Sequence, residues 1–368
     1  MSHHPFHLRR LSVLLAVGLL GLSACGGDDD GAETTSQTST AAGQAATSAP
    51  PSTEPVTLRL GYFPNVTHAP AIIGVDEGIF EDALADNVTL QTSTFNAGPA
   101  AVEALFAEAL DATFIGPNPA INAYAQSKGE AIRIISGATS GGAFLVVREG
   151  ITTSADLEGT KIATPQLGNT QDVALRAWLK GEGLSADLQG GGDVSVVPQE
   201  NAQSLETFVA GEIDGAWVPE PWATRFIQEA GAKVLVDERD LWPEGEYVTT
   251  HLVVRTEFLN DHPDVVEQLI TGEVEAVRTV NEGGAEARTI VNAGIEKITG
   301  KALPQAVIDA AWANLTFTVD PIASSLAKSA SDAEAAGLLE PVDLSGIYDL
   351  SILNKVLSAG GQSEVEGL

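Results

Sequence analysis

Residues 168–172, with the sequence Gly-Asn-Thr-Gln-Asp, have the pattern of a loop that opens into a helix. They follow a strand-like stretch, Lys161–Thr164, and precede apolar residues with helical spacing at 173–179. The first N–H groups of a helix lack partners and carry a partial positive charge, so such a segment can hold an oxyanion without a basic side chain. Capping alone, by Asn169 or Thr170, would explain the same residues. Both interpretations stay open at this stage.

A Pro-Glu-Pro corner at 219–221 is the second candidate for ligand chemistry. Trp217 and Trp222 flank its acid, Glu220. If these side chains face a cleft, they form an aromatic wall with one carboxylate, which could take an alkyl chain or an ammonium group. A tryptophan in a strand is more often part of the core, and that alternative is also open.

Further candidates lie in loops that follow expected strands. His68 could donate to an anion, or could simply pack or face water. Asn118 lies between two prolines that fix a turn, so we expect its side chain to be presented rather than buried. The full set of candidate ligand-binding residues is His68, Asn96, Asn118, Thr139, Ser140, Gly168, Asn169, Thr170, Gln171, Trp217, Glu220 and Trp222. Neighbouring loops add Asn65, Thr67, Gln166, Gln199 and Asn201, and lysine and arginine are missing from both groups.

Catalytic and cofactor signatures are weak in this chain. No G-x-S-x-G, H-E-x-x-H, Walker or strand-linked G-x-G-x-x-G motif is found. A single cysteine excludes a cysteine-rich zinc site, an iron–sulfur cluster and a disulfide framework. We therefore expect no catalytic residues, no metal and no cofactor, although a pair of catalytic carboxylates among so many acids is not excluded.

The elements that must position these residues alternate between strand and helix. Strand patterns at 57–62, 88–94, 110–115 and 132–138 are separated by loops and helical stretches. Such alternation predicts an α/β fold with parallel sheets and helices on their faces. Helical patterns dominate the last third, at 263–282, 285–299, 304–314 and 323–336.

An internal repeat divides this pattern into two units. The series of helix, strand and Pro-x-Pro corner at 102–119 recurs at 205–221, with Glu103 matching Glu206 and Asp111 matching Asp214. Two further strands, at 144–148 and 251–255, both end in Val-Val-Arg and bracket the second unit. We therefore predict a first lobe from residues 56–143, a second lobe from 144–250, and a return to the first lobe with C-terminal helices over 251–368. Generic similarity between any two α/β units is the plainer alternative.

The amino terminus has the pattern of an export signal. Arg9 and Arg10 precede an apolar run at 11–20 that is too short to span a bilayer, and Leu-Ser-Ala-Cys follows at 22–25. This resembles a bacterial lipobox, in which the cysteine, here Cys25, carries the lipid. We expect a signal peptide over 1–24 and a lipidated cysteine with a flexible linker over 25–55. An ordinary secretory signal with a chance cysteine is the alternative.

The charge balance limits the classes of binding partner that we expect. The 368 residues contain 50 acidic and 19 basic side chains, for a net charge of −31. Nucleic-acid binding needs clustered positive charge, so nucleic acid is not expected as a partner. The acidic total fits a soluble, exported surface.

These motifs resemble the solute-binding lipoproteins of ABC importers, in the branch for nitrate, sulfonate, taurine and thiamine-pyrimidine precursors. The segments that carry the resemblance are Leu-Gly-Tyr-Phe-Pro at 60–64, Phe-Asn-Ala-Gly-Pro at 95–99, Leu-Asp-Ala at 110–112, Thr-Pro-Gln-Leu-Gly-Asn-Thr at 164–170 and Ile-Asp-Gly-Ala-Trp at 213–217. The resemblance implies a type II periplasmic-binding-protein fold, with two α/β lobes around a ligand cleft. It implies a monomer on the outer face of the cytoplasmic membrane that passes its ligand to the permease subunits.

Within that branch the chain is most similar to the aliphatic-sulfonate binders. Their anion-contacting element maps to Gly168, Asn169 and Thr170. Nitrate binders use a lysine in the cleft that has no good counterpart here, and the related pyrimidine-synthase enzymes use a cysteine-rich iron site. Three functions follow from this reading: a binder of a sulfonate or taurine, a binder of nitrate or of a pyrimidine-like cation or heterocycle, and, least favoured, an enzyme on the same fold.

Overall fold

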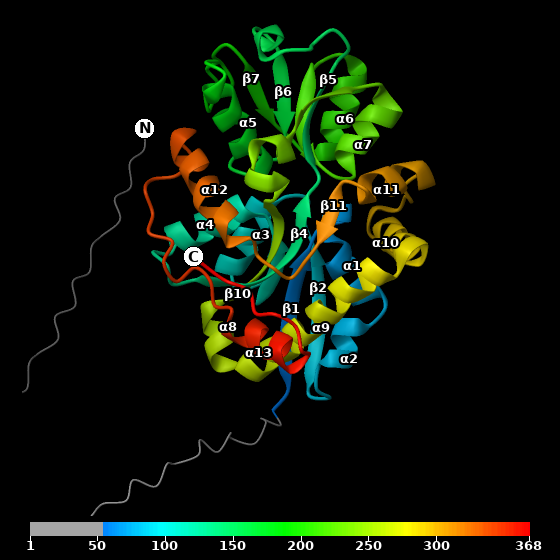
Figure 1. The fold of residues 1–368 in the computed structure, drawn as a ribbon, viewed down its shortest axis with the longest axis vertical. Coiled ribbons are helices and arrows are strands. Elements are labelled where there is room, and N and C mark those ends of the chain that lie inside the picture. The colour runs from blue at the N-terminus through cyan, green and yellow to red at the C-terminus, as the bar shows by residue number, and fades with distance from the viewer. Residues whose placement is uncertain (1–53) are drawn as a thin grey trace, which may run out of the picture. The chain divides into compact units, whose positions relative to one another are not determined.

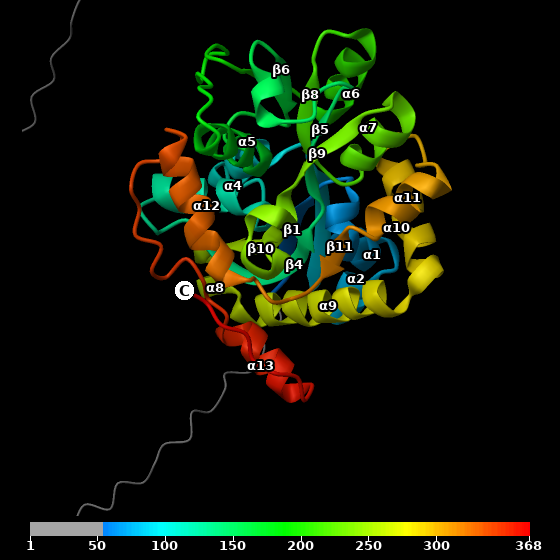
Figure 2. The ribbon, with the colours of Figure 1, turned by 45° about the horizontal axis from the view of Figure 1, so that its top comes forward.

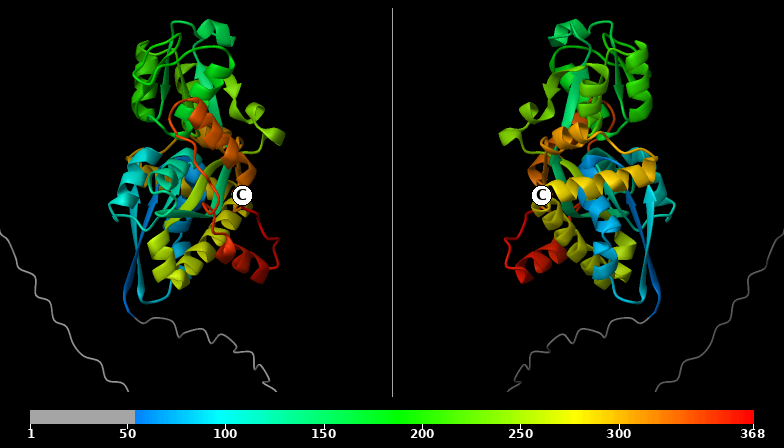
Figure 3. Two further views of the ribbon diagram at one scale, coloured as in Figure 1. Left: turned by 90° about the vertical axis from the view of Figure 1, so that its left-hand side faces the viewer. Right: turned by 90° about the vertical axis from the view of Figure 1, so that its right-hand side faces the viewer.

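Two β-sheets organise residues 54–368, the part of the chain that the computed structural model describes. The predicted signal peptide, Cys25 and all but the last two residues of the predicted linker lie outside this part. Each sheet is covered by helices, and Figures 1 and 3 show the second sheet with its helices (green) on one side of the crossings between the lobes. The fold is therefore α/β with two lobes, as the strand and helix pattern predicted.

The first sheet has six strands in the order β11-β4-β10-β3-β1-β2. β1 pairs in parallel with β2 and β3, whereas β10 runs antiparallel to β3 and β4. The bounds are β1 (Val56–Tyr62), β2 (Val88–Thr94), β3 (Ala112–Ile115), β4 (Ile132–Gly141), β10 (Val248–Arg255) and β11 (Leu315–Phe317).

Helices from both ends of the described chain cover this sheet, and two clusters of buried apolar side chains form its core. The early helices are a 3-10 turn η1 (Val66–His68), α1 (Ala69–Asp76), α2 (Ile79–Ala83), α3 (Gly98–Phe106) and α4 (Pro117–Gln126). The late ones are α8 (Thr256–Asp261), α9 (Pro263–Glu282), α10 (Gly284–Thr299), α11 (Gln305–Trp312), α12 (Ala323–Ala335) and α13 (Ser351–Ala359). The four late helices predicted from 263 to 336 are confirmed, whereas α13 and β11 were not predicted.

The second sheet has five strands in the order β7-β6-β8-β5-β9. Its elements are β5 (Ala143–Val147), η2 (Ser154–Leu157), β6 (Lys161–Thr164), α5 (Thr170–Gly181), β7 (Ser195–Pro198), α6 (Asn201–Ala210), β8 (Gly215–Pro219), α7 (Trp222–Ala230) and β9 (Lys233–Asp237). β6 pairs in parallel with β7 and β8, and β5 runs antiparallel to β8 and β9. Read from β9, the order is β9-β5-β8-β6-β7, which corresponds strand by strand to β4-β10-β3-β1-β2 of the first sheet. These five strands therefore have the same topology in both sheets.

The two aspartates of the sequence repeat occupy equivalent places in the two sheets. Asp111 accepts a hydrogen bond from the backbone N–H of Arg59 in the neighbouring strand β1, and Asp214 accepts one from the backbone N–H of Lys161 in the neighbouring strand β6. Each also faces the arginine of a Val-Val-Arg stretch, Arg255 at 3.4 Å and Arg148 at 3.8 Å. The repeat therefore encodes the same turn from helix to central strand in both lobes.

The chain crosses between the sheets twice. One residue, Gly142, joins β4 to β5 with φ +73°, and a Cβ there would lie 2.2 Å from Leu315 Cδ2, which requires glycine. The return runs through the short helices η3 (Glu238–Leu241) and η4 (Pro243–Gly245) into β10. β10 begins at Val248, before the strand predicted from His251.

α12 lies where the lobes meet. It packs against α5 of the second lobe and against α4 and β10 of the first, and Figure 2 shows it (orange) alongside α4. No helix among the described residues has the length and apolarity needed to cross a bilayer.

Candidate functional site

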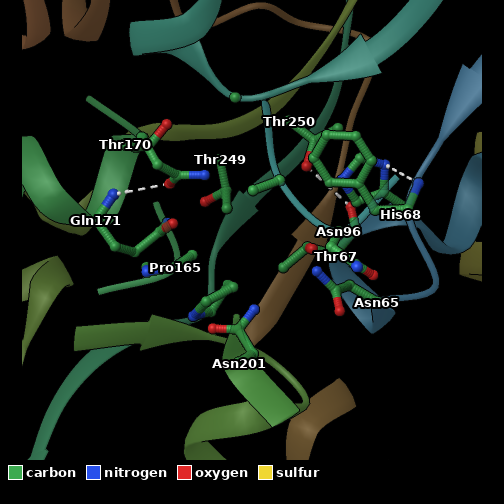
Figure 4. A pocket seen from close by; sticks show the side chains of 15 residues that line it. Asn65, Thr67, His68, Asn96, Pro165, Thr170, Gln171, Asn201, Thr249 and Thr250 are labelled. Atoms are coloured by element: carbon green, nitrogen blue, oxygen red, sulfur yellow. Dashed lines mark hydrogen bonds between the residues drawn. The ribbon is translucent and has the colours of Figure 1, made fainter. Parts of the chain in front are cut away.

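A small cavity between the two lobes is the candidate ligand site (Figure 4). Its volume is about 30 Å³, enough for a ligand or ligand head group of only a few non-hydrogen atoms. Fifteen residues line it: Phe63, Asn65, Thr67, His68, Asn96, Ala97, Gly116, Pro165, Asn169, Thr170, Gln171, Asn201, Pro219, Thr249 and Thr250. We call the cavity lined by these fifteen residues the inner cavity.

Strand direction explains why these residues meet. The loops that leave β1, β2, β3, β6 and β8 lie at the carboxyl ends of parallel strands, where open α/β sheets bind ligands. Thr249 and Thr250 come instead from the start of β10. Because β10 is antiparallel to β3, its start lies at the same edge of the sheet as the end of β3.

Several helices begin at the inner cavity. Thr170 and Asn201 are the first residues of α5 and α6, and Ala97 and Gly116 immediately precede α3 and α4. Each of these helices brings unpaired N–H groups and a partial positive charge to its first turn. The cavity thus has the electrostatics of an anion site without basic side chains.

Two polar atoms in the wall of the cavity have no partner. The Oγ1 atom of Thr170 and the Oδ1 atom of Asn201 are buried and make no hydrogen bond. Buried polar groups in folded proteins are nearly always paired, so these two atoms mark positions in the cavity wall that are open to a ligand or an ordered water. A threonine hydroxyl can donate to an anion, and an amide side chain can donate or accept.

The loop before α5 is held rigidly by Asp172, which is fully buried. Its Oδ1 accepts from the Thr164 hydroxyl at 2.8 Å, and its Oδ2 accepts from the Gly168 N–H at 3.0 Å and from Arg176 Nε at 3.1 Å. Asn169 caps the helix, with Oδ1 accepting from the Gln171 N–H at 3.2 Å. The two interpretations of this segment are therefore compatible, because Asn169 caps the helix and also lines the cavity.

His68 lines the cavity from the first lobe as a neutral ring. Its Nδ1 accepts from the Phe63 N–H at 3.4 Å, which places the ring proton on Nε2. Full burial lowers the pKa of His68 to about 3, because the charged form would lose its hydration. His68 can therefore donate one hydrogen bond but supplies no charge near neutral pH.

The lining of the inner cavity is entirely uncharged. None of its fifteen residues is Lys, Arg, Asp or Glu. Five of the twelve predicted ligand-binding residues are in this lining, namely His68, Asn96, Asn169, Thr170 and Gln171, and the other seven are not.

The Pro-Glu-Pro corner contributes only Pro219 to the lining of the inner cavity, and Trp217, Glu220 and Trp222 lie outside that lining, so the expected aromatic wall is not formed. Trp217 is fully buried in the second lobe, where its Nε1 donates to Glu238 at 2.8 Å. Glu220 is also buried and accepts from Thr224 and, at 2.7 Å, from Asn314 Nδ2. Burial raises its pKa, and its donors are already within the protein. Trp222 lies outside the lining and donates across the lobes to Asn65 Oδ1 at 3.0 Å.

The other candidates support the cavity from behind or face elsewhere. Asn118 is buried and donates to the Ser329 carbonyl at 2.9 Å, because its turn faces α12 rather than the cleft. Thr139 donates to the Thr67 carbonyl at 2.7 Å, which braces the loop after β1. Ser140 lines a separate hollow beside Arg239, and Gly168 bonds to Asp172.

An open chamber adjoins the inner cavity and shares Asn96, Ala97 and Pro165 with it. This "outer chamber", about 710 Å³ in volume, is also lined by Thr94, Phe95, Ala100, Gln166, Pro198, Gln199, Glu200 and Gln203. Asn96 Nδ2 donates to Glu200 Oε1 at 2.9 Å, so the two lobes are tied together at this boundary.

Seven residues of the lining are in neither group of sequence candidates: Phe63, Ala97, Gly116, Pro165, Pro219, Thr249 and Thr250. The signal for Phe63 was available, since it follows the strand at 57–62 directly. The two threonines lie at the start of a strand, and only knowledge that this strand runs antiparallel would have placed them at the ligand edge.

Comparisons with known proteins agree with this geometry. A model of the NMT1-like family matches residues 51–294. The taurine-binding periplasmic protein of Escherichia coli (strain K12) is 27% identical over 194 residues, which are 53% of this chain and 58% of that protein.

Two solved structures establish the fold. The alkanesulfonate-binding protein SsuA from Xanthomonas axonopodis pv. citri, solved with MOPS bound, aligns with a TM-score of 0.67 and 21% identity, covering 80% of this chain and 99% of that one. The periplasmic nitrate-binding protein NrtA from Synechocystis PCC 6803 aligns with a TM-score of 0.70 and 15% identity, covering 83% and 89%. The chain therefore has a periplasmic-binding-protein fold, and these relatives are named as binding proteins rather than as enzymes.

Proposed function

The chain belongs to the NMT1-like family, and from this premise we propose that it is the substrate-binding component of an ABC importer. It captures a small organic anion, an aliphatic sulfonate or taurine, between its lobes and delivers it to the permease in the membrane. It binds without turning its ligand over. The named sulfonate and taurine binders among its relatives support this assignment.

The observation that carries the proposal is the unpartnered hydroxyl of Thr170. It is buried at the first turn of α5, inside a lining with no charged residue. A sulfonate offers three oxygens with a single negative charge, which several neutral N–H and O–H donors can share. A dry site with aimed donors holds such an anion strongly because little reorganisation is needed.

The size of the cavity limits the ligand. About 30 Å³ takes at most a small anionic group, such as nitrate or the head group of a sulfonate, and leaves little room for the chain of an organic anion. Nitrate is therefore the second candidate, favoured by the small volume and disfavoured by the lack of a lysine in the lining.

Calorimetry on the purified protein tests the proposal. Titration with taurine, methanesulfonate, ethanesulfonate, butanesulfonate, nitrate and a hydroxymethyl-pyrimidine separates the candidates. Binding of at least one sulfonate, with nitrate weak or silent, is the expected result. Binding heat with only nitrate or only the pyrimidine would contradict the sulfonate assignment. Turnover of a bound ligand would contradict the proposal that the protein only binds its ligand.

A variant links the ligand to the cavity. Thr170→Val removes the hydroxyl and keeps the shape, so the affinity for the bound sulfonate is expected to fall about tenfold or more. Thr289→Val is the matched control, because Thr289 is an exposed helical residue whose hydroxyl bonds only to the Ala285 carbonyl. An equal effect of the two substitutions would contradict binding at α5.

We also propose export and lipid anchoring through Cys25, with the mature chain as a monomer on the outer face of the cytoplasmic membrane. The Leu-Ser-Ala-Cys pattern at 22–25 supports this, and a periplasmic relative agrees with export. Cys25→Ser is expected to move the protein from the membrane fraction to the soluble or uncleaved fraction. Mass spectrometry showing an unmodified cysteine in membrane-bound protein would contradict it.

A further inference from the structure

The two chambers of the cleft differ in charge. The inner cavity has an uncharged lining, whereas the outer chamber has one ionisable side chain among its lining residues, Glu200. Gln166, Gln199 and Gln203 surround it with neutral hydrogen-bonding groups. If the anionic head of a ligand fills the inner cavity, the part that extends into the outer chamber is lined by one charged side chain, the carboxylate of Glu200.

Glu200 is adjacent to the inner cavity in two ways. Its Oε1 accepts from Asn96 Nδ2 at 2.9 Å, and Asn96 lines both chambers. Its neighbour in the chain, Asn201, lines the inner cavity with an unpartnered Oδ1. The Asn96 contact uses one carboxylate oxygen, and Oε2 makes no hydrogen bond among those found in the described part of the chain.

The small inner volume makes this position relevant to specificity. About 30 Å³ holds a head group with little of its chain, so the far end of a two-carbon ligand extends towards the boundary with the outer chamber. Asn96, which is bonded to Glu200, lies on that boundary. The distal group of the ligand and the carboxylate are thus brought to the same region.

We infer that Glu200 is a specificity-determining residue, which makes the site prefer anions with a positively charged distal group. The preferred class is then a short ω-amino sulfonate, ahead of a plain alkanesulfonate and well ahead of a disulfonate. This inference rests on the proposed function, because it assumes a sulfonate head in the inner cavity. The mechanism is electrostatic: the carboxylate attracts an ammonium group and repels a second anion.

The expected size of the effect follows from the exposure of Glu200. An ion pair at an exposed position is weakened by water, and such pairs change affinity by only about two- to fivefold. The effect must also shrink as salt is added, since exposed charges are screened over about 8 Å at physiological ionic strength. Repulsion between Glu200 and a second sulfonate group on the ligand should change the affinity by a similar factor.

The test uses three ligands of equal length: taurine, ethanesulfonate and ethane-1,2-disulfonate. Calorimetry on the unmodified protein should rank them in that order. Glu200→Gln keeps an oxygen that can accept from Asn96, so the tie between the lobes is retained while the charge is lost. In this variant the ratio of taurine to ethanesulfonate affinity should fall about two- to fivefold, and disulfonate binding should improve.

Glu206→Gln is the matched control, because Glu206 is exposed on α6, the helix that Glu200 immediately precedes, and lines neither chamber. It removes the same charge and should leave all three affinities in their original ratios. Glu200→Lys should reverse the order of taurine and the disulfonate.

The outcomes separate this inference from the proposed function. If the sulfonates bind but Glu200→Gln leaves their ratios unchanged, or Glu206→Gln changes them equally, the role of Glu200 is refuted and the sulfonate binder stands. If other sulfonates bind but these three do not, this inference fails alone; if no sulfonate binds at all, the proposed function fails and this inference fails with it.

Discussion

The two lobes share the order and directions of five strands, but equivalent residues in them have different surroundings. Asp111 in the first lobe is 1% exposed and pairs with Arg59 and Arg255, whereas Asp214 in the second is 37% exposed and lies 3.8 Å from Arg148. Among the described residues, the helices α8 to α13 follow the return to the first lobe, while the second lobe keeps three α-helices. One sequence motif thus yields a buried charge network in one lobe and an exposed pair in the other.

The Pro-x-Pro corners show the same divergence. Asn118 bonds to the Ser329 carbonyl in α12, and Glu220 bonds to Asn314 just before β11. Both corners therefore hold the last third of the chain, and Pro219 is their only contribution to the lining of the inner cavity. Equivalent positions in a duplicated fold can be reused to attach later segments, while the loops at helix starts line the inner cavity.

The largest expected effect tests the aspartate pair. Asp111→Ala leaves two arginines without their buried partner and should lower the free energy of unfolding by about 3 kcal/mol. Asp214→Ala removes an exposed partner and should cost less than about 1 kcal/mol. Urea unfolding of both variants measures the difference, and equal losses would show that burial does not distinguish the lobes.

The next prediction concerns the two crossings between the lobes. The single-residue crossing at Gly142 has no ionisable group, but the return crossing contains Glu238, which is buried against Trp217 and Trp242. Burial raises the pKa of Glu238 to about 7 from 4.5. Because the folded pKa lies above the unfolded one, Glu238 stabilises the fold when protonated. That contribution declines as the pH rises from about 4.5 to about 7, by roughly 3 kcal/mol in all.

Glu238→Gln should remove this part of the pH dependence. His68 and His251 act in the opposite direction, since burial lowers their pKa values to about 3 and about 4 and stability then falls as the pH drops below about 6.5. The informative quantity is therefore the difference in unfolding free energy between variant and unmodified protein at each pH. Parallel curves from pH 4.5 to 7.5 would contradict the assignment.

A smaller effect contrasts the two walls of the inner cavity. The hydroxyl of Thr170, in the second lobe, is unpartnered, whereas that of Thr250, in the first, already donates to the Thr67 carbonyl at 3.1 Å. Thr170→Val should weaken sulfonate binding about tenfold or more, and Thr250→Val less than about threefold. Calorimetry with the same ligand compares the two losses of affinity. A larger loss for Thr250→Val would indicate that the anion is bound mainly by the first lobe.

The smallest expected effect is at the contact between the lobes. Trp222→Phe removes the Nε1–H that donates to Asn65 Oδ1 but keeps a ring beside Arg225. Loss of one such bond, worth about 1 kcal/mol, should speed ligand release about fivefold. Stopped-flow displacement measures the rate, with Trp178→Phe as the control. Unchanged release would show that this bond does not stabilise closure.

Local patterns in the sequence predicted much of the fold. The helical spacing at 263–282 matches α9, and the repeat of Asp111 and Asp214 matches two equivalent turns. The segment at 168–172 was placed at a helix start because Gly, Asn and Thr have well-understood roles there. These successes depend on residues close in the chain.

The failures depend on distant partners. Asn118 and Glu220 looked available, because nothing nearby in the sequence satisfies them, yet Ser329 and Asn314 do so in the folded chain. Trp217 was ambiguous between wall and core until Glu238, in the crossing back to the first lobe, was found against its indole nitrogen. The start of β10 entered the site only through the antiparallel pairing with β3.

The sequence by itself determined that two similar α/β units would meet, that the loops would offer neutral donors, and that a helix would begin at Thr170. Periodicity, capping chemistry and the absence of basic residues in those loops are local properties, so they can be read along the chain. Only the tertiary structure decided which donors remain free for a ligand. That depends on which polar groups the last third of the chain has already paired, and on a closure of the lobes that leaves Thr170 and Asn201 buried without partners.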